Sequence, residues 1–204
     1  MKKRYVVLIA AASILTASCA SMVAKTETRS YMVKIDVDGE SVQPKALADD
    51  LKDVLARRAG NMNVDMRFMP DVIPPAPAGG IVMKPMNFGP VSMVFMQCAD
   101  ASIANISNGR SSYNGMGQSD AESYTACIFP FAPEGQAKKF RLVIGLRYTE
   151  SSSGGVSGMM AAGINKAFAS TMGKEEMGQV FFQQVEDGLK AKYPSAVTVD
   201  KQSL

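Results

Sequence analysis

The sequence predicts an α+β fold, in which an antiparallel β-meander packs against about three helices in a single domain with one disulfide. Three observations predict it. Two segments, Pro44–Ala59 and Lys174–Tyr193, repeat their apolar residues at helical spacing. Other segments alternate apolar and polar residues, as strands with one buried face do. Two cysteines, Cys98 and Cys127, fall in two of these predicted strands.

The first predicted elements are a strand, a helix and a second strand. Ser30–Val37 is apolar and rich in β-forming residues. Pro44–Ala59 places its leucines and a valine on one helical face, with the proline suited to the first turn and Gly60 to the C-terminal cap. From Met62 to Phe68 every second residue is apolar, which predicts a half-buried strand.

The middle of the chain is predicted to hold three strands and two long loops. Pro70–Pro90 is rich in proline and glycine, which predicts an extended surface loop. Val91–Cys98 and Ser123–Phe131 are predicted strands, and the Ser-, Asn- and Gly-rich segment Ala99–Glu122 between them predicts a second long loop. Phe140–Tyr148 alternates clearly and is predicted to be a strand.

The last part of the chain is predicted to hold two helices and an edge strand. Glu150–Gly158 is expected to be flexible, and apolar residues from Val156 to Met172 fall at helical spacing. The small residues of that helix suit either close packing on the sheet or a surface for a partner. Lys174–Tyr193 is the last predicted helix, with Pro194 as its stop, and Ala196–Val199 is a predicted edge strand.

The N-terminus has the three-part pattern of a secretory signal peptide. Met1–Arg4 is basic, Tyr5–Leu15 is apolar, and small residues follow. A helix needs about 20 apolar residues to span a membrane, and this run is shorter. We therefore expect residues 1–18 to be removed on export and residues 30–204 to form one globular domain.

The segment Leu15-Thr16-Ala17-Ser18-Cys19 resembles the lipobox of bacterial lipoproteins, with threonine where that family usually has leucine. The resemblance implies cleavage before Cys19, acylation of that cysteine, and a lipidated end and short tether over residues 19–29. Ala20-Ser21 implies sorting to the outer membrane, at its periplasmic face. Ordinary cleavage after Ala20 is the alternative, and it would leave a soluble periplasmic chain.

The mature chain is predicted to carry no net charge. The whole sequence has 22 Lys and Arg against 19 Asp and Glu, and the leader holds three of the basic residues, Lys2, Lys3 and Arg4. A domain without positive excess lacks the electrostatic footprint of nucleic-acid binding. We therefore expect no nucleic-acid partner.

Two cysteines remain besides Cys19. An even pair in an exported chain predicts a disulfide between Cys98 and Cys127, at the two ends of the second long loop. Such a bridge closes a loop of about 30 residues and stabilises the fold by about 3–4 kcal/mol. Two buried free thiols are the alternative.

The composition excludes several catalytic chemistries. The sequence has no histidine, which removes Ser-His-Asp and Cys-His mechanisms and the usual imidazole sites for zinc and copper. No glycine-rich phosphate-binding motif occurs. We therefore expect no cofactor and no enzymatic activity, with an envelope enzyme using serine or carboxylate groups as the weakest alternative.

Methionine is unusually frequent, with three pairs at the spacing M-x-x-M: Met66 and Met69, Met83 and Met86, Met93 and Met96. Thioethers are soft ligands for Cu(I). Positions three apart in a strand lie on opposite faces, so only Met83 and Met86, in the first predicted loop, are candidates to share a metal ion. Methionine as adaptable core filler is the simpler interpretation.

Taken together, these features predict a non-enzymatic, lipid-anchored periplasmic protein. We expect it to be held to the membrane by its lipid and to bind another envelope protein as an accessory or assembly factor. The tether, the neutral mature chain, the long loop closed by the disulfide and the missing catalytic groups favour this hypothesis. The alternative is a periplasmic protein that binds a small ligand or Cu(I) through its methionine-rich segments.

Overall fold

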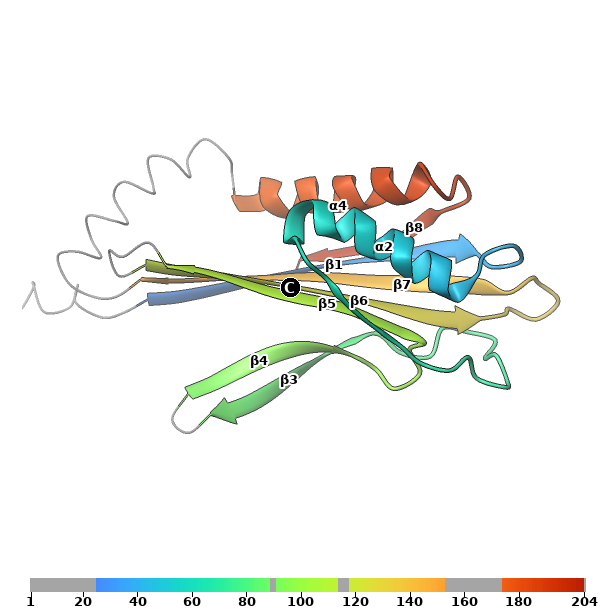
Figure 1. The fold of residues 1–204 in the computed structure, drawn as a ribbon, viewed down its shortest axis with the longest axis horizontal. Helices are drawn as coiled ribbons and strands as arrows, with labels where there is room; N and C mark the ends of the chain where they lie inside the picture. Colours follow the sequence, from blue (N-terminus) through green and yellow to red (C-terminus); the bar gives the residue numbers. More distant parts are fainter. Residues whose placement is uncertain (1–24, 89–90, 114–117, 153–173, 204) are drawn as a thin grey trace, which may run out of the picture. The chain divides into compact units, whose positions relative to one another are not determined.

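The computed structural model describes residues 25–88, 91–113, 118–152 and 174–203 (Figure 1). Strands and helices both occur in these ranges, which confirms the α+β class. Their bounds are β1 Lys25–Asp38, α2 Pro44–Ala59, β2 Asn63–Met66, β3 Ile81–Phe88, β4 Val91–Cys98, β5 Ala104–Tyr113, β6 Gln118–Phe131, β7 Lys139–Ser152, α4 Lys174–Lys190 and β8 Val197–Ser203.

The chain divides into two compact units. The larger comprises Arg29–Arg110, Ala121–Tyr148 and Lys174–Leu204, and the smaller comprises Met1–Thr28, Ser111–Asp120 and Thr149–Gly173. The larger unit therefore holds both described helices and most of the strand residues. Within the smaller unit, the hydroxyl groups of Thr28 and Thr149 are hydrogen-bonded at 3.2 Å.

Six strands form one sheet in the order β2-β5-β6-β7-β1-β8, and β3 pairs with β4 in a separate two-stranded sheet. A meander is present, but it consists of β5, β6 and β7, which are neighbours both along the chain and in the sheet. Of the strands predicted to form it, Val91–Cys98 belongs to the other sheet, as β4. The β1–β8 and β2–β5 pairs are antiparallel. Both helices cover one face of the large sheet, and the β3–β4 hairpin lies on the other (Figure 1).

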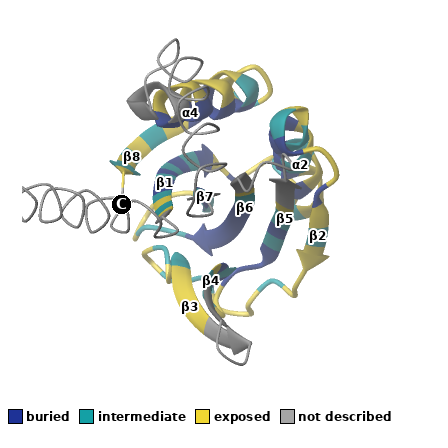
Figure 2. Ribbon diagram, turned by 90° about the vertical axis from the view of Figure 1, so that its left-hand side faces the viewer, coloured by how far each residue is buried: buried dark blue, intermediate teal, exposed yellow. Residues whose placement is uncertain are grey.

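The main core lies between the helices and the large sheet. It contains apolar side chains from α2 and α4 and from alternate positions of the central strands, among them Leu47, Leu51, Leu55, Phe181, Val185, Leu189, Ile35, Ile128 and Ile144. A second cluster, Cys98, Cys127, Phe129 and Val143, lies against the other face. The central strand β6 is therefore buried on both faces, as Figure 2 shows.

Helix α2 begins and ends where the sequence predicts. Pro44 is in its first turn, where a missing N–H costs nothing. Gly60 ends it with φ 77°, a conformation that glycine adopts without strain, and its N–H donates to the carbonyl of Ala56 at 2.9 Å. Local signals therefore determine both ends of this helix.

The prediction of a loop over Pro70–Pro90 is wrong in its second half, because Ile81–Phe88 forms β3. Pro85 lies opposite Val94 within the β3–β4 ladder. Proline is tolerated there because β3 has only one neighbouring strand, so its other edge needs no backbone donor. Residues 70–80 are irregular, as predicted.

The prediction of a second long loop over Ala99–Glu122 is also wrong. Most of it belongs to β5 and to the beginning of β6. In β5, Ala104 and Ile106 are buried while Asn105 and Ser107 are half-buried. The polar residues of β5 therefore alternate with core residues. Because the segment contains so many polar residues, its sequence predicted a loop instead of a strand.

The predicted disulfide between Cys98 and Cys127 is present, with Cα atoms 5.5 Å apart. It does not close the base of a loop, as the sequence had suggested. Cys98 is the last residue of β4 and Cys127 lies inside β6, so the bridge joins the small sheet to the large one.

Several predicted boundaries differ from the structure. The strand predicted from Met62 to Phe68 has only four residues, and Phe68 is exposed because the chain leaves the sheet after Arg67. Strand β1 begins at Lys25, inside the predicted tether of residues 19–29. Helix α4 ends at Lys190, three residues before its predicted end. The helix expected from Val156 to Met172 lies outside the described residues.

Glu186 joins α4 to β8 from a buried position. Its Oε1 accepts a hydrogen bond from Thr198 Oγ1 at 2.8 Å and lies 2.7 Å from Lys201 Nζ. Burial, the largest single influence, raises the pKa of Glu186, but hydrogen bonds from Lys201 and Thr198 and the charges of Lys201 and Lys190 outweigh it. The pKa therefore lies below its ordinary value of 4.5, so the ionised side chain stabilises the fold above that pH.

Glu186→Gln is expected to lower the free energy of unfolding by about 1–2 kcal/mol at pH 7, because it removes a charged hydrogen-bond acceptor from a buried site. The difference from wild type should shrink as the pH falls below 4.5, since Glu186 is then increasingly protonated in both folded and unfolded chains. Urea unfolding at several pH values measures both effects. The exposed neighbour Asp187→Asn is the control, with an expected change below about 0.5 kcal/mol. A difference that stays constant down to pH 3 would contradict the ionic role.

Candidate functional site

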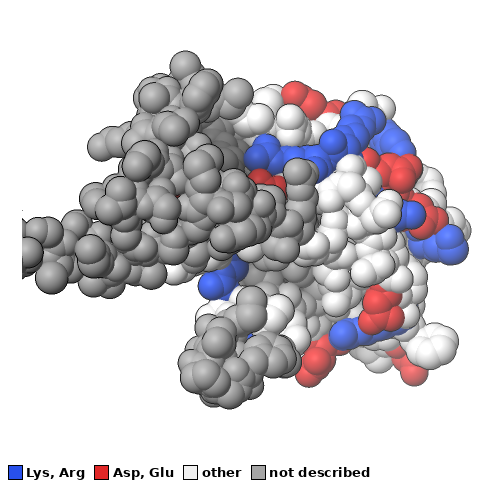
Figure 3. Space-filling model, turned by 60° about the vertical axis from the view of Figure 1, so that its left-hand side comes forward, with Lys and Arg blue, Asp and Glu red and all other residues white. Residues whose placement is uncertain are grey.

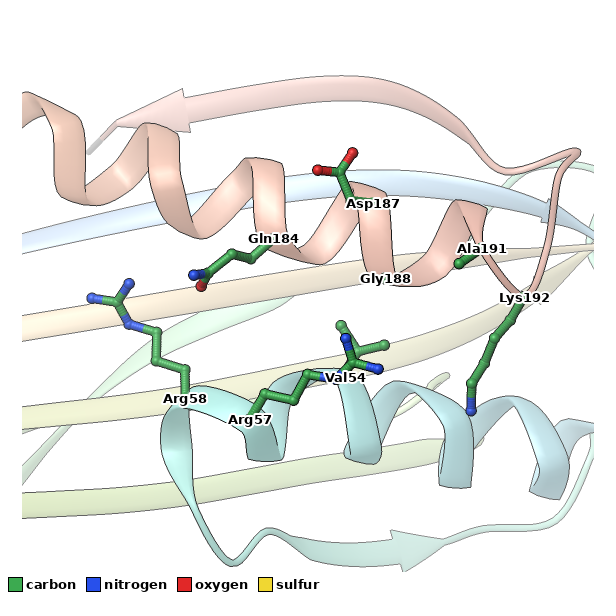
Figure 4. Close-up of a pocket in the computed structure, with 8 residues that line it drawn as sticks. All are labelled: Val54, Arg57, Arg58, Gln184, Asp187, Gly188, Ala191 and Lys192. Atoms are coloured by element: carbon green, nitrogen blue, oxygen red, sulfur yellow. The ribbon is translucent and has the colours of Figure 1, made fainter.

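A groove of about 500 Å³ lies between α2 and α4 (Figure 4). Its volume falls within the range of about 300–1,000 Å³ that is usual for binding sites. Both helices and the turn after α4 supply its lining, which consists of Val54, Arg57, Arg58, Gln184, Asp187, Gly188, Ala191 and Lys192. All eight belong to the larger unit.

Gly188 sets the closest approach of the two helices. A Cβ atom at this position would lie 2.8 Å from Cγ1 of Val54, which is closer than real Cβ contacts. Glycine therefore allows α4 to rest on α2 at the floor of the groove. Ala191, one turn later, keeps the groove open because its side chain is short.

Three cations line the groove, whereas Asp187 is the one carboxylate among the lining residues. Arg57 and Arg58 come from the last turn of α2, where the helix dipole favours positive charge. Lys192 extends from the turn after α4 toward α2 (Figure 4). On the face drawn in Figure 3, Lys and Arg gather along the upper part, the side of the helices, whereas Asp and Glu are scattered.

Arg58 is held in place by Tyr124. Its Nε donates to the phenol oxygen at 3.0 Å, and the phenol hydroxyl donates to Oε2 of Glu122 at 2.9 Å. Burial and the charge of Glu122 raise the pKa of Tyr124 to about 12. The phenol therefore stays protonated at neutral pH and keeps both hydrogen bonds.

Lys192 is held by Asp50 of α2, with which it forms an ion pair. The hydroxyl of Tyr193 also donates to Asp50, at 2.6 Å. Burial, the largest influence, raises the pKa of Asp50, but the hydrogen bonds from Lys192 and Tyr193 and the charge of Lys192 outweigh it and lower the pKa. Asp50 therefore stays ionised at neutral pH and holds Lys192 in place at the end of the groove.

Arg57 differs from these two cations. Within the part of the chain that the structure describes, its guanidinium makes no hydrogen bond and no ion pair. It is exposed and lines the groove opposite Gln184, whose amide offers both a donor and an acceptor. The arrangement is suited to binding an anionic group, and its lining contains no serine, cysteine or threonine nucleophile.

The residues singled out from the sequence lie elsewhere. Met83 and Met86 are in a strand, β3, rather than in the loop on which their shared copper site depended, and they lie opposite Met96 and Met93 in the register. Cys19 is outside the described residues.

Sequence reasoning missed the groove. Two consecutive arginines, Arg57 and Arg58, at the end of α2 were the available signal. The helix dipole alone accounts for such residues, so the pattern did not point to a ligand.

The described ranges contain neither a cluster of metal ligands nor a membrane-spanning helix. No three or more Cys, Asp or Glu side chains come together there as ligands for a metal ion. Neither α2 nor α4 has the length and apolar character needed to cross a bilayer. The sequence matches no family model and no curated protein.

Proposed function

We propose that this chain is a non-enzymatic lipoprotein that binds an acidic segment of another envelope protein, as an accessory or assembly factor. In this proposal Cys19 carries the lipid and holds the chain at the periplasmic face of the outer membrane. The groove between α2 and α4, where the guanidinium of Arg57 has no partner among the described residues, is the observation that carries the binding. The Cys98–Cys127 disulfide supports export, because such bridges persist in oxidising compartments.

The chemistry of the groove favours an acidic protein segment as its ligand. A carboxylate can accept two parallel N–H hydrogen bonds from the Arg57 guanidinium, which is the strongest geometry for such a contact. The amide of Gln184 can bond a peptide group beside that carboxylate. The floor of Val54, Gly188 and Ala191 is apolar and accepts the aliphatic part of a side chain. A small anionic ligand is the alternative occupant, because the volume suits one.

Arg57→Glu is expected to weaken binding of the partner at least tenfold, because it places a negative charge where the proposal puts the partner's carboxylate. Arg57 is exposed and has no partner within the described residues, so the fold should lose only the helix-dipole contribution, about 0.3–1 kcal/mol. The measurement is quantitative recovery of proteins crosslinked to the full chain in intact envelopes. Lys52→Glu is the matched control, since it makes the same charge change on α2 outside the groove.

A protein recovered with wild type and Lys52→Glu but lost with Arg57→Glu supports the proposal. Raising the salt concentration during recovery should also reduce its yield, because exposed ion pairs are screened. Recovery of the same proteins in the same amounts from all three chains would contradict it. Loss of an anionic metabolite, and of no protein, from the Arg57→Glu chain would favour the small ligand.

The proposed anchor is tested by mass spectrometry of the mature N-terminus. We expect an acylated Cys19 as the first residue. A free Ser21 would indicate cleavage after Ala20 and a soluble periplasmic chain. An unprocessed Met1 in the cytoplasm would contradict export altogether.

A further inference from the structure

Arg58 is held in the helix groove by only part of its guanidinium. The residue is half-buried at the end of α2, and its Nε donates to the phenol oxygen of Tyr124. The other N–H groups of a guanidinium are on its two terminal nitrogens. Within the described part of the chain, these nitrogens of Arg58 make no hydrogen bond and no ion pair. Arg58 is therefore fixed through Nε and can still donate from its terminal nitrogens.

The group that fixes Arg58 belongs to the core. Tyr124 is 1% exposed, and its ring centroid lies 6.1 Å from that of Phe181, so packing sets the position of its phenol oxygen. Its hydroxyl donates to Glu122 and accepts from Arg58. Arg58 and Glu122 form no direct ion pair in the described ranges. No carboxylate therefore contacts the guanidinium of Arg58 there.

The other charged groups of the groove leave the surroundings of Arg58 open to an anion. Lys192 is already in an ion pair at the opposite end. The carboxylate of Asp187 accepts a hydrogen bond from the amide of Gln183 at 2.9 Å, and it points away from α2 in Figure 4. Gln184 extends instead toward the last turn of α2 (Figure 4). The carboxylate that lines the groove is therefore turned away from the arginines of α2.

Arg57 and Arg58 point in different directions. Consecutive residues of a helix do not face each other. In Figure 4 the side chain of Arg57 runs along α2 toward Val54, whereas that of Arg58 points to the end of the groove. The two guanidinium groups are therefore placed to bind two separate carboxylates and not to share one.

We propose that Arg58, positioned by Tyr124, binds a second carboxylate of the partner, so that the groove recognises a segment with two acidic side chains. The inference rests on the proposed function, in which Arg57 binds the first carboxylate. The terminal nitrogens of Arg58 can donate two parallel hydrogen bonds to a carboxylate. Because Tyr124 already holds this side chain, less conformational entropy is lost when the ligand binds. Tyr124 is a positioning residue and does not contact the ligand.

The first test measures how short synthetic peptides of alanine and glycine bind to the full chain in detergent. One peptide carries a single glutamate, and a series carries two glutamates at increasing separation. At the best separation, the second glutamate should improve the dissociation constant about tenfold, because it adds a hydrogen-bonded charged contact. Salt should reduce this gain, since a half-exposed ion pair is partly screened.

Arg58→Gln should abolish the gain, so that the one-glutamate and two-glutamate peptides bind within about twofold of each other. Its affinity for the one-glutamate peptide should stay within about twofold of wild type, because Arg57 is still present. Lys52→Gln makes the same charge change on α2 outside the groove and should keep the full gain. An equal gain in wild type and Arg58→Gln would overturn the inference.

Tyr124→Phe tests the positioning role, because it keeps the ring in the core and removes the hydroxyl. The gain should fall below about threefold, whereas binding of the one-glutamate peptide should not change, a selective loss that general destabilisation would not produce. Tyr193→Phe is the matched control, since it removes a hydroxyl that bonds Asp50 at the other end of the groove. Arg58→Lys keeps the charge without the Nε donor and should also lose most of the gain. A full gain in either Tyr124→Phe or Arg58→Lys would overturn the role of Tyr124.

The peptide measurements also separate this inference from the proposed function. If one glutamate improves binding, and Arg57→Glu removes that improvement, but a second glutamate adds nothing at any separation, the acidic partner stands and the second site fails. If no glutamate peptide binds wild type more tightly than a peptide of alanine and glycine alone, both fail.

Discussion

Replacing Cys98 and Cys127 together by alanine is expected to lower the free energy of unfolding by about 3–4 kcal/mol. The bridge spans 29 residues of sequence, and removing it lets the unfolded chain reach many more conformations. The β3–β4 sheet should be affected most, because the bridge attaches its last residue to the centre of the large sheet. Urea unfolding under non-reducing conditions measures the change.

Reductant supplies the internal control for this prediction. Reduced wild type should unfold with nearly the free energy of the double variant, whereas reductant should leave the double variant unchanged. Cys19 is kept in both chains, so that the anchor does not differ. If reductant fails to shift the unfolding of wild type, the two cysteines are not bridged in solution.

Phe181→Ala is expected to lower the free energy of unfolding by about 3–5 kcal/mol, because it leaves a cavity in the main core. Phe181 projects from α4 into the interface with the sheet, where its ring centroid lies 6.1 Å from that of Tyr124 and 5.7 Å from that of Phe182. Its loss should loosen α4 from the strands beneath it. Urea unfolding again measures the effect.

The adjacent residue gives a matched control. Val180 is on the same helix and is 43% exposed, so Val180→Ala should change the free energy of unfolding by less than about 0.5 kcal/mol. Both variants change an apolar residue of α4 to alanine, and they differ in burial and in the size of the group removed. Equal losses in the two variants would contradict the packing of α4 that the structure shows.

The parts of the fold that sequence reasoning predicted are those with local signals. Helix α2 has an apolar face, an initial proline and a final glycine within seventeen residues, so its bounds follow from its own sequence. The alternation in Phe140–Tyr148 identifies the centre of β7 in the same way. Cys98 and Cys127 were paired correctly because they are the two cysteines of the sequence besides Cys19.

The missed parts depend on neighbours that are distant in sequence. Strand β3 contains Pro85 and is a strand only because β4 pairs with it. Strand β5 looks polar because only alternate residues reach the core. The groove combines Arg57 with Lys192, which are brought together by helix packing and have no shared local pattern. Likewise, the exposure of Phe68 follows from where β2 ends, which its alternating sequence does not indicate.

The place of β1 in the large sheet has a consequence for the order of folding. Its two neighbours are β7 and β8, which begin at Lys139 and Val197. During synthesis, β1 is therefore made more than 100 residues before either strand with which it pairs. Pairings over such separations form slowly, because the intervening chain must first be ordered. A chain with this connectivity cannot complete the pairing of β1 on both sides until β8 has been made, so the large sheet closes late in folding.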